Sequence, residues 1–203
     1  MSILSDQKID ALLKTGELVI YPLLDGHQVK GAKADLRLDN VLFLIKRIEL
    51  ESYDAMDLSR PGQKPVDYLE RHVIPYDGAF ILHPGEFALA PSFESFRIPK
   101  KLVGLLDGRS SLGRLGIIVH VTSGSVDPGF SGPLILELAN LGRIPVKLFP
   151  LMRIASIKFL SVDGDIQHPY KDKYNGIDNV LFPGSRLHED EDLSTISKLH
   201  EFF

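Results

Sequence analysis

Cysteine is absent from this chain of 203 residues. Disulfides and thiolate metal sites are therefore impossible, and the composition fits a reducing compartment, so we expect a cytoplasmic protein. No apolar run approaches the ~20 residues that a membrane-spanning helix needs. Residues 1–10 also lack the basic and apolar segments of a signal peptide. These absences predict a chain with no membrane partner.

An excess of positive charge is absent as well. The 23 lysines and arginines are outnumbered by 27 aspartates and glutamates, which gives a net charge of −4. Nucleic-acid-binding domains usually carry a basic stripe or patch, so we expect no nucleic-acid partner. A ligand that bears phosphate would have to be held by a few local cations.

Helical periodicity is scarce beyond the N-terminus. Ser5 precedes Ile9, Leu12 and Leu13 at the spacing of a capped amphipathic helix that stops at Gly16, so residues 1–16 are predicted as an N-terminal helix. The later β-like runs predict strands at residues 18–21, 35–38, 41–45, 79–82, 87–90, 103–106, 117–122, 134–138, 146–148 and 154–160. Many short strands with closely spaced turns are typical of a mainly β barrel or sandwich. We expect one domain over residues 1–203.

Two polar segments interrupt this pattern. Residues 51–71 contain Pro61, Gly62 and Pro65 and are interpreted as an insertion that is partly helical around residues 66–71. Residues 167–203 are interpreted as a C-terminal arm with a short helix at 193–202. Such an arm often packs on a neighbouring subunit or closes over a site.

The most concentrated polar motif is Asp-Gly-Arg-Ser-Ser-Leu-Gly-Arg-Leu-Gly at residues 107–116. The guanidinium groups of Arg109 and Arg114 suit phosphate oxygens. Its small residues would let backbone N–H groups approach an anion. The alternative is a polar turn that opens a short helix, since glycine and serine are common turn residues.

Glu137 stands out because it is the acid of an otherwise apolar strand, Leu-Ile-Leu-Glu-Leu-Ala-Asn at residues 134–140. Alternation places Leu134, Leu136 and Leu138 on one face and Glu137 on the other. One interpretation is a solvated face of an antiparallel strand. The other is a catalytic acid and base in a dry pocket.

Two further segments could contribute to a site. Residues 120–129 run from His120 into the turn Asp127-Pro128-Gly129, where Asp127 is either a ligand or simply a turn residue. Residues 168–176 interleave lysines with Tyr170 and Tyr174. They could bind phosphate and stack on a sugar or base, or form an exposed polar arm.

In order along the chain, these motifs resemble the dCTP deaminase branch of the dUTPase-like superfamily. The most specific part is Gly-Arg-Ser-Ser-Leu-Gly-Arg-Leu-Gly, followed by Asp-Pro-Gly-Phe-Ser-Gly at 127–132 and by Leu136-Glu137. Other matching stretches are residues 31–37 and 82–86, with weaker matches at 4–6, 169–170, 173–174 and 185–186. The resemblance covers nearly the whole chain.

The resemblance implies a distorted β-barrel or jelly roll, in a homotrimer with active sites between subunits. It implies hydrolytic deamination of dCTP to dUTP in the metabolism of pyrimidine deoxynucleotides. The implied catalytic residues are Glu137, Arg114 and Ser110. The implied substrate contacts are Arg109, Ser110 and Ser111 for phosphates, Val126 and Asp127 for sugar and base, and Tyr170 and Lys173 from the arm.

The resemblance also implies the cofactor and the regulator. Mg²⁺ would enter with the triphosphate. No zinc is expected, because the zinc-dependent nucleobase deaminases use a Pro-Cys-x-x-Cys motif that this chain lacks. Glu137 would therefore move the protons. Feedback inhibition by dTTP would act through His120, Val121 and Thr122.

Two positions depart from the family pattern. Ile177 stands where the arm usually has glutamine, and Ser123-Gly124 replaces the Ala-His pair of some monofunctional members. A glycine there resembles bifunctional relatives that also hydrolyse dUTP to dUMP, whereas Val121 resembles the monofunctional type. A bifunctional enzyme, a dUTPase and a non-catalytic nucleotide-binding trimer remain the alternatives.

Overall fold

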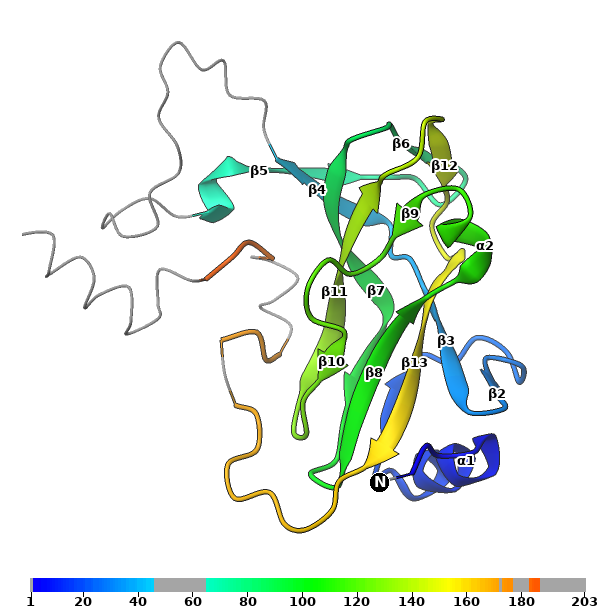
Figure 1. The fold of residues 1–203 in the computed structure, drawn as a ribbon, viewed down its shortest axis with the longest axis vertical. Helices are drawn as coiled ribbons and strands as arrows, with labels where there is room; N and C mark the ends of the chain where they lie inside the picture. The colour runs from blue at the N-terminus through cyan, green and yellow to red at the C-terminus, as the bar shows by residue number, and fades with distance from the viewer. Residues whose placement is uncertain (1, 46–64, 172, 177–182, 187–203) are drawn as a thin grey trace, which may run out of the picture.

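The computed structural model describes residues 2–45, 65–171, 173–176 and 183–186 (Figure 1). Helix α1 (Asp6–Thr15) has the ends that the sequence predicts. The Ser5 hydroxyl accepts a hydrogen bond from the main-chain N–H of Lys8, and Gly16 adopts a left-handed φ of 71° beyond the last turn. None of the helices among the described residues is long and apolar enough to cross a membrane.

The described residues contain thirteen strands and two further short helices. The strands are β1 (Val19–Tyr21), β2 (Val29–Lys30), β3 (Lys33–Arg37), β4 (Val41–Ile45), β5 (Leu69–Val73), β6 (Phe80–Leu82), β7 (Phe87–Arg97), β8 (Leu102–Gly108), β9 (Ile117–Ile118), β10 (Ser125–Val126), β11 (Ser131–Asn140), β12 (Val146–Leu148) and β13 (Arg153–Ser161). The helices are the 3₁₀ helix η1 (Pro65–Tyr68) and α2 (Ser110–Gly113). The prediction of a mainly β fold is confirmed.

The strands form two main sheets. One has the order β5-β4-β7-β11-β9, with β1 also paired to β7, and the other has the order β10-β8-β13-β3-β2. Strands β12 and β6 form a separate pair. Within the described part of the chain these sheets are open and do not close into a continuous barrel (Figure 1). Apolar side chains between the two large sheets make one core.

Local patterns located most strands but misjudged two segments. Residues 66–71 are predicted as partly helical; η1 confirms this for residues 66–68, whereas residues 69–71 belong to β5, which pairs with β4. A strand was predicted over residues 117–122, but β9 ends at Ile118 because the chain then crosses toward the other sheet. The rest of the insertion and the predicted helix at 193–202 lie outside the described residues.

A buried ion pair connects the two large sheets. Glu94 of β7 is fully buried and accepts hydrogen bonds from the main-chain N–H of Arg37 at 2.8 Å and from Gln28 Nε2 at 2.7 Å. Arg37 Nη1 lies 3.3 Å from Glu94 Oε1. Burial raises the pKa of Glu94, and the bonds from Arg37 and Gln28 oppose that shift. Both carboxylate oxygens therefore face hydrogen-bond donors.

The arm packs along the turn that precedes β11. Tyr170 donates its main-chain N–H to the Pro128 carbonyl at 2.8 Å, and Gly176 donates to the Ser131 carbonyl at 2.6 Å. Asn175 Oδ1 accepts the Ser131 N–H at 2.7 Å. A methyl group on Gly132, whose φ is 131°, would lie 2.8 Å from the Gly176 carbonyl oxygen. The close approach of turn and arm therefore requires glycine at this position.

We predict that Glu94→Gln destabilises the fold by about 3 kcal/mol. The amide would place a donor against the donors of Arg37 or Gln28. Urea denaturation measures the loss. Glu70→Gln is the matched control, since the Glu70 side chain is 60% exposed, and it should change stability by no more than about 0.5 kcal/mol. Equal stability of the two variants would contradict the importance of the buried pair.

We predict that Gly132→Ala releases the arm from the turn. The added methyl group would meet the backbone of Gly176, so hydrogen exchange at the Tyr170 and Gly176 amides should accelerate, as measured by mass spectrometry. Gly164→Ala is the control because Gly164 also has a positive φ, of 86°, but open space around it. The same exchange in both variants would show that backbone strain alone, and not the arm contact, is responsible.

Candidate functional site

A cavity of about 730 Å³ lies where β11, η1 and the arm meet. Its polar lining residues are Ser123, Ser125, Asp127, Glu137 and Ser185, and its aromatic lining residues are Tyr68, Phe87, Phe130, Tyr170 and Tyr174. The remaining walls are mainly aliphatic. A cavity of this size and lining, with few polar groups, is typical of a small-molecule site.

Glu137 occupies the wall of this cavity in the way that strand alternation predicts. Leu136 and Leu138 are fully buried on the core face of β11, while Ile135 and the half-buried Glu137 line the cavity. Leu134, at the register shift between Pro133 and Ile135, is buried and also lines the cavity. The Glu137 carboxylate accepts the main-chain N–H of Val121 at 2.7 Å. The acid is therefore neither fully exposed nor buried without a partner.

The donor Val121 belongs to a bridging segment, residues 119–124, which crosses from one large sheet to the other. The Val119 carbonyl accepts the main-chain N–H of Glu137 in β11, and the Gly124 carbonyl accepts that of Leu106 in β8. A methyl group on Gly124 would lie 3.3 Å from the His120 ring. The bridging segment contains His120, Val121 and Thr122, and its conformation sets the environment of Glu137.

The turn after β10 also faces the cavity. Val126 is buried and pairs with Gly104 of β8, while Asp127 is exposed. The Asp127 carbonyl accepts the N–H of Phe130 at 3.1 Å, so the segment is a tight turn. Both interpretations of Asp127 therefore fit the structure, because the turn residue also lines the cavity.

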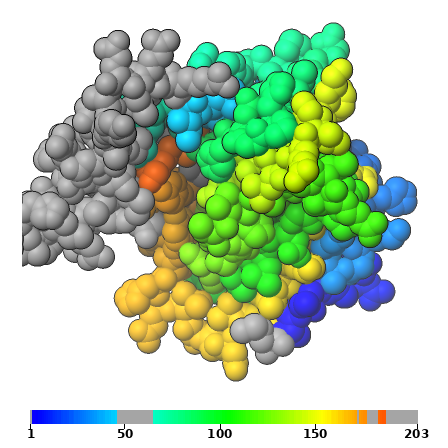
Figure 2. Space-filling view, turned by 45° about the horizontal axis from the view of Figure 1, so that its top comes forward, coloured from blue at the N-terminus to red at the C-terminus, as the bar shows by residue number. Residues whose placement is uncertain are grey.

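The arm contributes Tyr170 and Tyr174 to the wall of the cavity. Tyr170 packs near Phe130, with ring centroids 6.1 Å apart, and its hydroxyl accepts the main-chain N–H of Tyr174. Lys173 Nζ lies 5.7 Å from the centre of the Tyr174 ring and donates to the Arg186 carbonyl. Figure 2 shows the described residues of the arm, in orange, along one side of the molecule. Ile177 lies outside the described residues.

The arginine loop of the same chain does not join the cavity. Arg109 precedes α2, Ser110 and Ser111 are exposed at its start, and Arg114 is exposed at its end. None of these four residues lines the cavity, and α2 lies across the strands from the arm (Figure 1). Glu137 is thus brought together with Val126, Asp127 and Tyr170, but not with Arg109, Ser110, Ser111 or Arg114.

The structure adds residues that the sequence did not mark as site residues. Tyr68 reaches the cavity from η1, and Tyr174 reaches it from the arm. The tyrosines among the lysines of the arm were a signal for Tyr174, but nothing local marks Tyr68. The N–H of Val121 is a backbone donor, which no side-chain motif reveals.

Comparison with known proteins identifies the family of this chain. The model of the dCTP deaminase-like family matches residues 3–162. The chain is 41% identical over 199 residues to "dCTP deaminase, dUMP-forming" of Dictyoglomus turgidum, which covers 98% of this chain and 95% of that protein. It is 39% identical over 197 residues to the dCTP deaminase of Glaesserella parasuis, with coverage of 93% and 99%.

A solved structure is also similar. The crystal structure of the 2′-deoxycytidine 5′-triphosphate deaminase from Agrobacterium tumefaciens superposes with a TM-score of 0.61 at 25% identity, over 79% of this chain. This chain spans about half of that protein, 48% of its length. The family match over most of the chain and these relatives establish that the protein belongs to the dCTP deaminase-like family.

Proposed function

We propose that this protein deaminates dCTP hydrolytically to dUTP and ammonia. The observation that carries the proposal is the position of Glu137, a carboxylate held by a main-chain N–H in the wall of a mainly apolar cavity. Several curated relatives are named dCTP deaminases. We include a cytoplasmic location in the proposal, which the absence of cysteine fits.

The chemistry requires a group that first accepts and then donates a proton. Glu137 would take a proton from water as the oxygen attacks C4 of cytosine. It would return that proton to the ring nitrogen. It would then take the proton of the new C4 hydroxyl and pass it to the amino group, so that the C4–N bond breaks, ammonia leaves and the carbonyl forms. General acid and base catalysis of this kind contributes about 10²–10⁴-fold. The aromatic and aliphatic walls would limit access of other water molecules.

The phosphates need cations that the cavity of one chain does not supply. No lysine or arginine appears among its described lining residues, and phosphate groups are usually bound by such side chains. We therefore propose a homotrimer in which Arg109, Ser110, Ser111 and Arg114 of one subunit complete the cavity of another. Arg114 and Ser110 would orient the attacking water there, while Tyr170 and Lys173 of the arm would approach the phosphates.

Mg²⁺ belongs to this proposal as part of the substrate. We propose that the triphosphate oxygens are its main ligands; among the described residues no group of three or more histidine, aspartate or glutamate side chains could hold a metal ion. We also keep the expectation that the reaction uses no zinc.

A second candidate is a bifunctional enzyme that carries dCTP on to dUMP. Relatives such as that of Dictyoglomus turgidum have names that include dUMP formation. Gly124 resembles the bifunctional relatives, whereas Val121 resembles the monofunctional type; a methyl group on Gly124 would lie 3.3 Å from the His120 ring, so this position affects the conformation of the bridging segment.

The experiment that tests the function is incubation of the purified protein with Mg²⁺ and dCTP, and separately with dUTP, followed by chromatography of the nucleotides. Accumulation of dUTP from dCTP is the expected result. Formation of dUMP and pyrophosphate would favour the second candidate, cleavage of dUTP alone a dUTPase, and binding without turnover a non-catalytic trimer. Adding dTTP to the same assay tests the proposed inhibition through His120, Val121 and Thr122, which a titration without effect would reject.

We predict that Glu137→Gln lowers turnover of dCTP by about 10²–10⁴-fold and leaves dCTP affinity within about threefold. The amide keeps the shape of the carboxylate and loses its basicity. Steady-state assays and calorimetry measure the two quantities, with the exposed Glu70→Gln as control. A variant with nearly normal turnover would show that another group is the base.

The shared site predicts that two inactive variants restore activity when they assemble together. Mixed trimers of Glu137→Gln and Arg109→Ala subunits should regain about one third of wild-type activity, because in either mixed composition one of the three sites combines an intact Glu137 with an intact Arg109 of the neighbouring subunit. Co-expression with two affinity tags isolates the mixed trimers. No recovery would place both residues in the site of a single chain and contradict the proposed assembly.

A further inference from the structure

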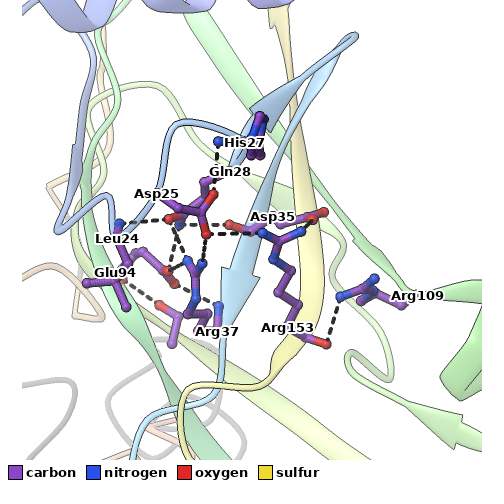
Figure 3. Close-up of polar contacts among 10 residues, drawn as sticks. Leu24, Asp25, His27, Gln28, Asp35, Arg37, Glu94, Arg109 and Arg153 are labelled. Carbon is purple, nitrogen blue, oxygen red and sulfur yellow. Dashed lines mark hydrogen bonds and ion pairs between the residues drawn. The ribbon is translucent and has the colours of Figure 1, made fainter.

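Arg109 has a neutral partner in this structure. Its Nη1 donates to the main-chain carbonyl of Arg153 at 3.2 Å (Figure 3). No carboxylate of the described residues forms an ion pair with Arg109. A guanidinium has five N–H donors, so this one bond orients the group and leaves its charge and its other donors for an anion.

The guanidinium group of Arg153 forms ion pairs with two carboxylates, while the Arg153 carbonyl contacts Arg109. Its Nη1 lies 3.3 Å from Asp35 Oδ2, and its Nη2 lies 3.1 Å from Asp25 Oδ2 (Figure 3). The main-chain N–H of His27 lowers the pKa of Asp25, and the Arg153 side chain acts in the same direction. Two carboxylates on different parts of the chain therefore fix one guanidinium.

The strand order of the sheet explains why the Arg153 carbonyl lies next to Arg109. Strand β13 begins at Arg153 and lies between β8, which ends just before Arg109, and β3, which carries Asp35. The register of β13 against β3 shifts between Arg153 and Ala155. Bulges of this kind redirect the backbone locally and are common near active sites. The irregularity falls at the residue whose carbonyl orients Arg109.

We propose that Arg153, anchored by Asp25 and Asp35, is a positioning residue that holds Arg109 ready for the phosphate chain of the nucleotide. This inference rests on the proposed function, in which Arg109 contacts the triphosphate. The Arg153 side chain pairs with Asp25, which also pairs with Arg37 at 2.6 Å, and with Asp35, which Lys33 also approaches, whereas its carbonyl contacts Arg109. The anion-binding arginine is thereby oriented without being neutralised.

The test compares a ligand that has phosphates with one that has none. Calorimetry in the Glu137→Gln background, where turnover is suppressed, measures binding of dCTP with Mg²⁺ and of deoxycytidine. Arg153→Ala keeps the main-chain carbonyl but removes the side-chain anchors that fix it, so dCTP binding should weaken by up to about tenfold, the contribution of one hydrogen bond to a charged group, and deoxycytidine binding by less than about twofold. Arg153→Lys should recover part of the dCTP affinity, because a lysine can pair with one of the two carboxylates.

Two further variants keep the test decisive. Asp25→Asn weakens one anchor of Arg153 and also the contact of Asp25 with Arg37, while Arg37 keeps its pair with Glu94. The Asp25 side chain is 37% exposed, so this variant should fold even if Arg153→Ala does not, and it should give a smaller loss that is again specific to dCTP. Lys147→Ala removes an exposed cation of β12 and should change neither affinity. Unchanged dCTP binding in both anchor variants, or equal losses for dCTP and deoxycytidine, would overturn the inference.

The outcome separates this inference from the proposed function. Turnover of dCTP by the wild-type protein, without a selective effect of Arg153→Ala or Asp25→Asn, would reject only the positioning role. A selective loss of dCTP binding in those variants, together with no turnover by the wild-type protein, would reject only the deaminase function.

Discussion

The buried ion pair between Glu94 and Arg37 links the sheet that carries Glu137 to the sheet that positions Arg109. Glu94 is on β7, which pairs with β11 and so with Glu137, whereas Arg37 is on β3, next to β13 and the Arg109 contact. Removing one partner of a buried ion pair leaves a charge without compensation, which usually costs several kcal/mol. The buried pair therefore favours the packing of the two sheets that brings Glu94 and Arg37 together.

Glu137 depends on that packing through the bridging segment. Residues 119–124 are hydrogen-bonded to β11 at one end and to β8 at the other, with the Val121 N–H directed to the Glu137 carboxylate between them. A ligand that moved one end of this segment would change the hydrogen bonding of the acid. This coupling is a physical basis for the regulation by dTTP that we propose, since two arrangements of one short segment would differ at the reacting group.

Sequence patterns predicted the elements whose causes are local. The cap at Ser5 and the left-handed Gly16 define α1, and alternation along β11 placed Glu137 opposite the core leucines. Sequence patterns gave wrong predictions where pairing with a strand that is distant in the chain determines the local structure. Residues 69–71 belong to a strand because they pair with β4. The strand predicted at 117–122 is shorter than expected because the chain crosses from one sheet to the other after Ile118.

The sequence by itself determined which chemical groups are present: an acid on an apolar strand, a loop with two arginines, and an arm with lysines and tyrosines. Only the tertiary structure decided which of them meet. The Glu137 carboxylate accepts the Val121 N–H, and Glu137 lines one cavity together with Tyr68 and Tyr174. The arginine loop of the same chain does not line this cavity. The physical reason is that side-chain chemistry and strand alternation are local properties, whereas backbone partners and cavity walls arise from contacts between residues far apart in the chain.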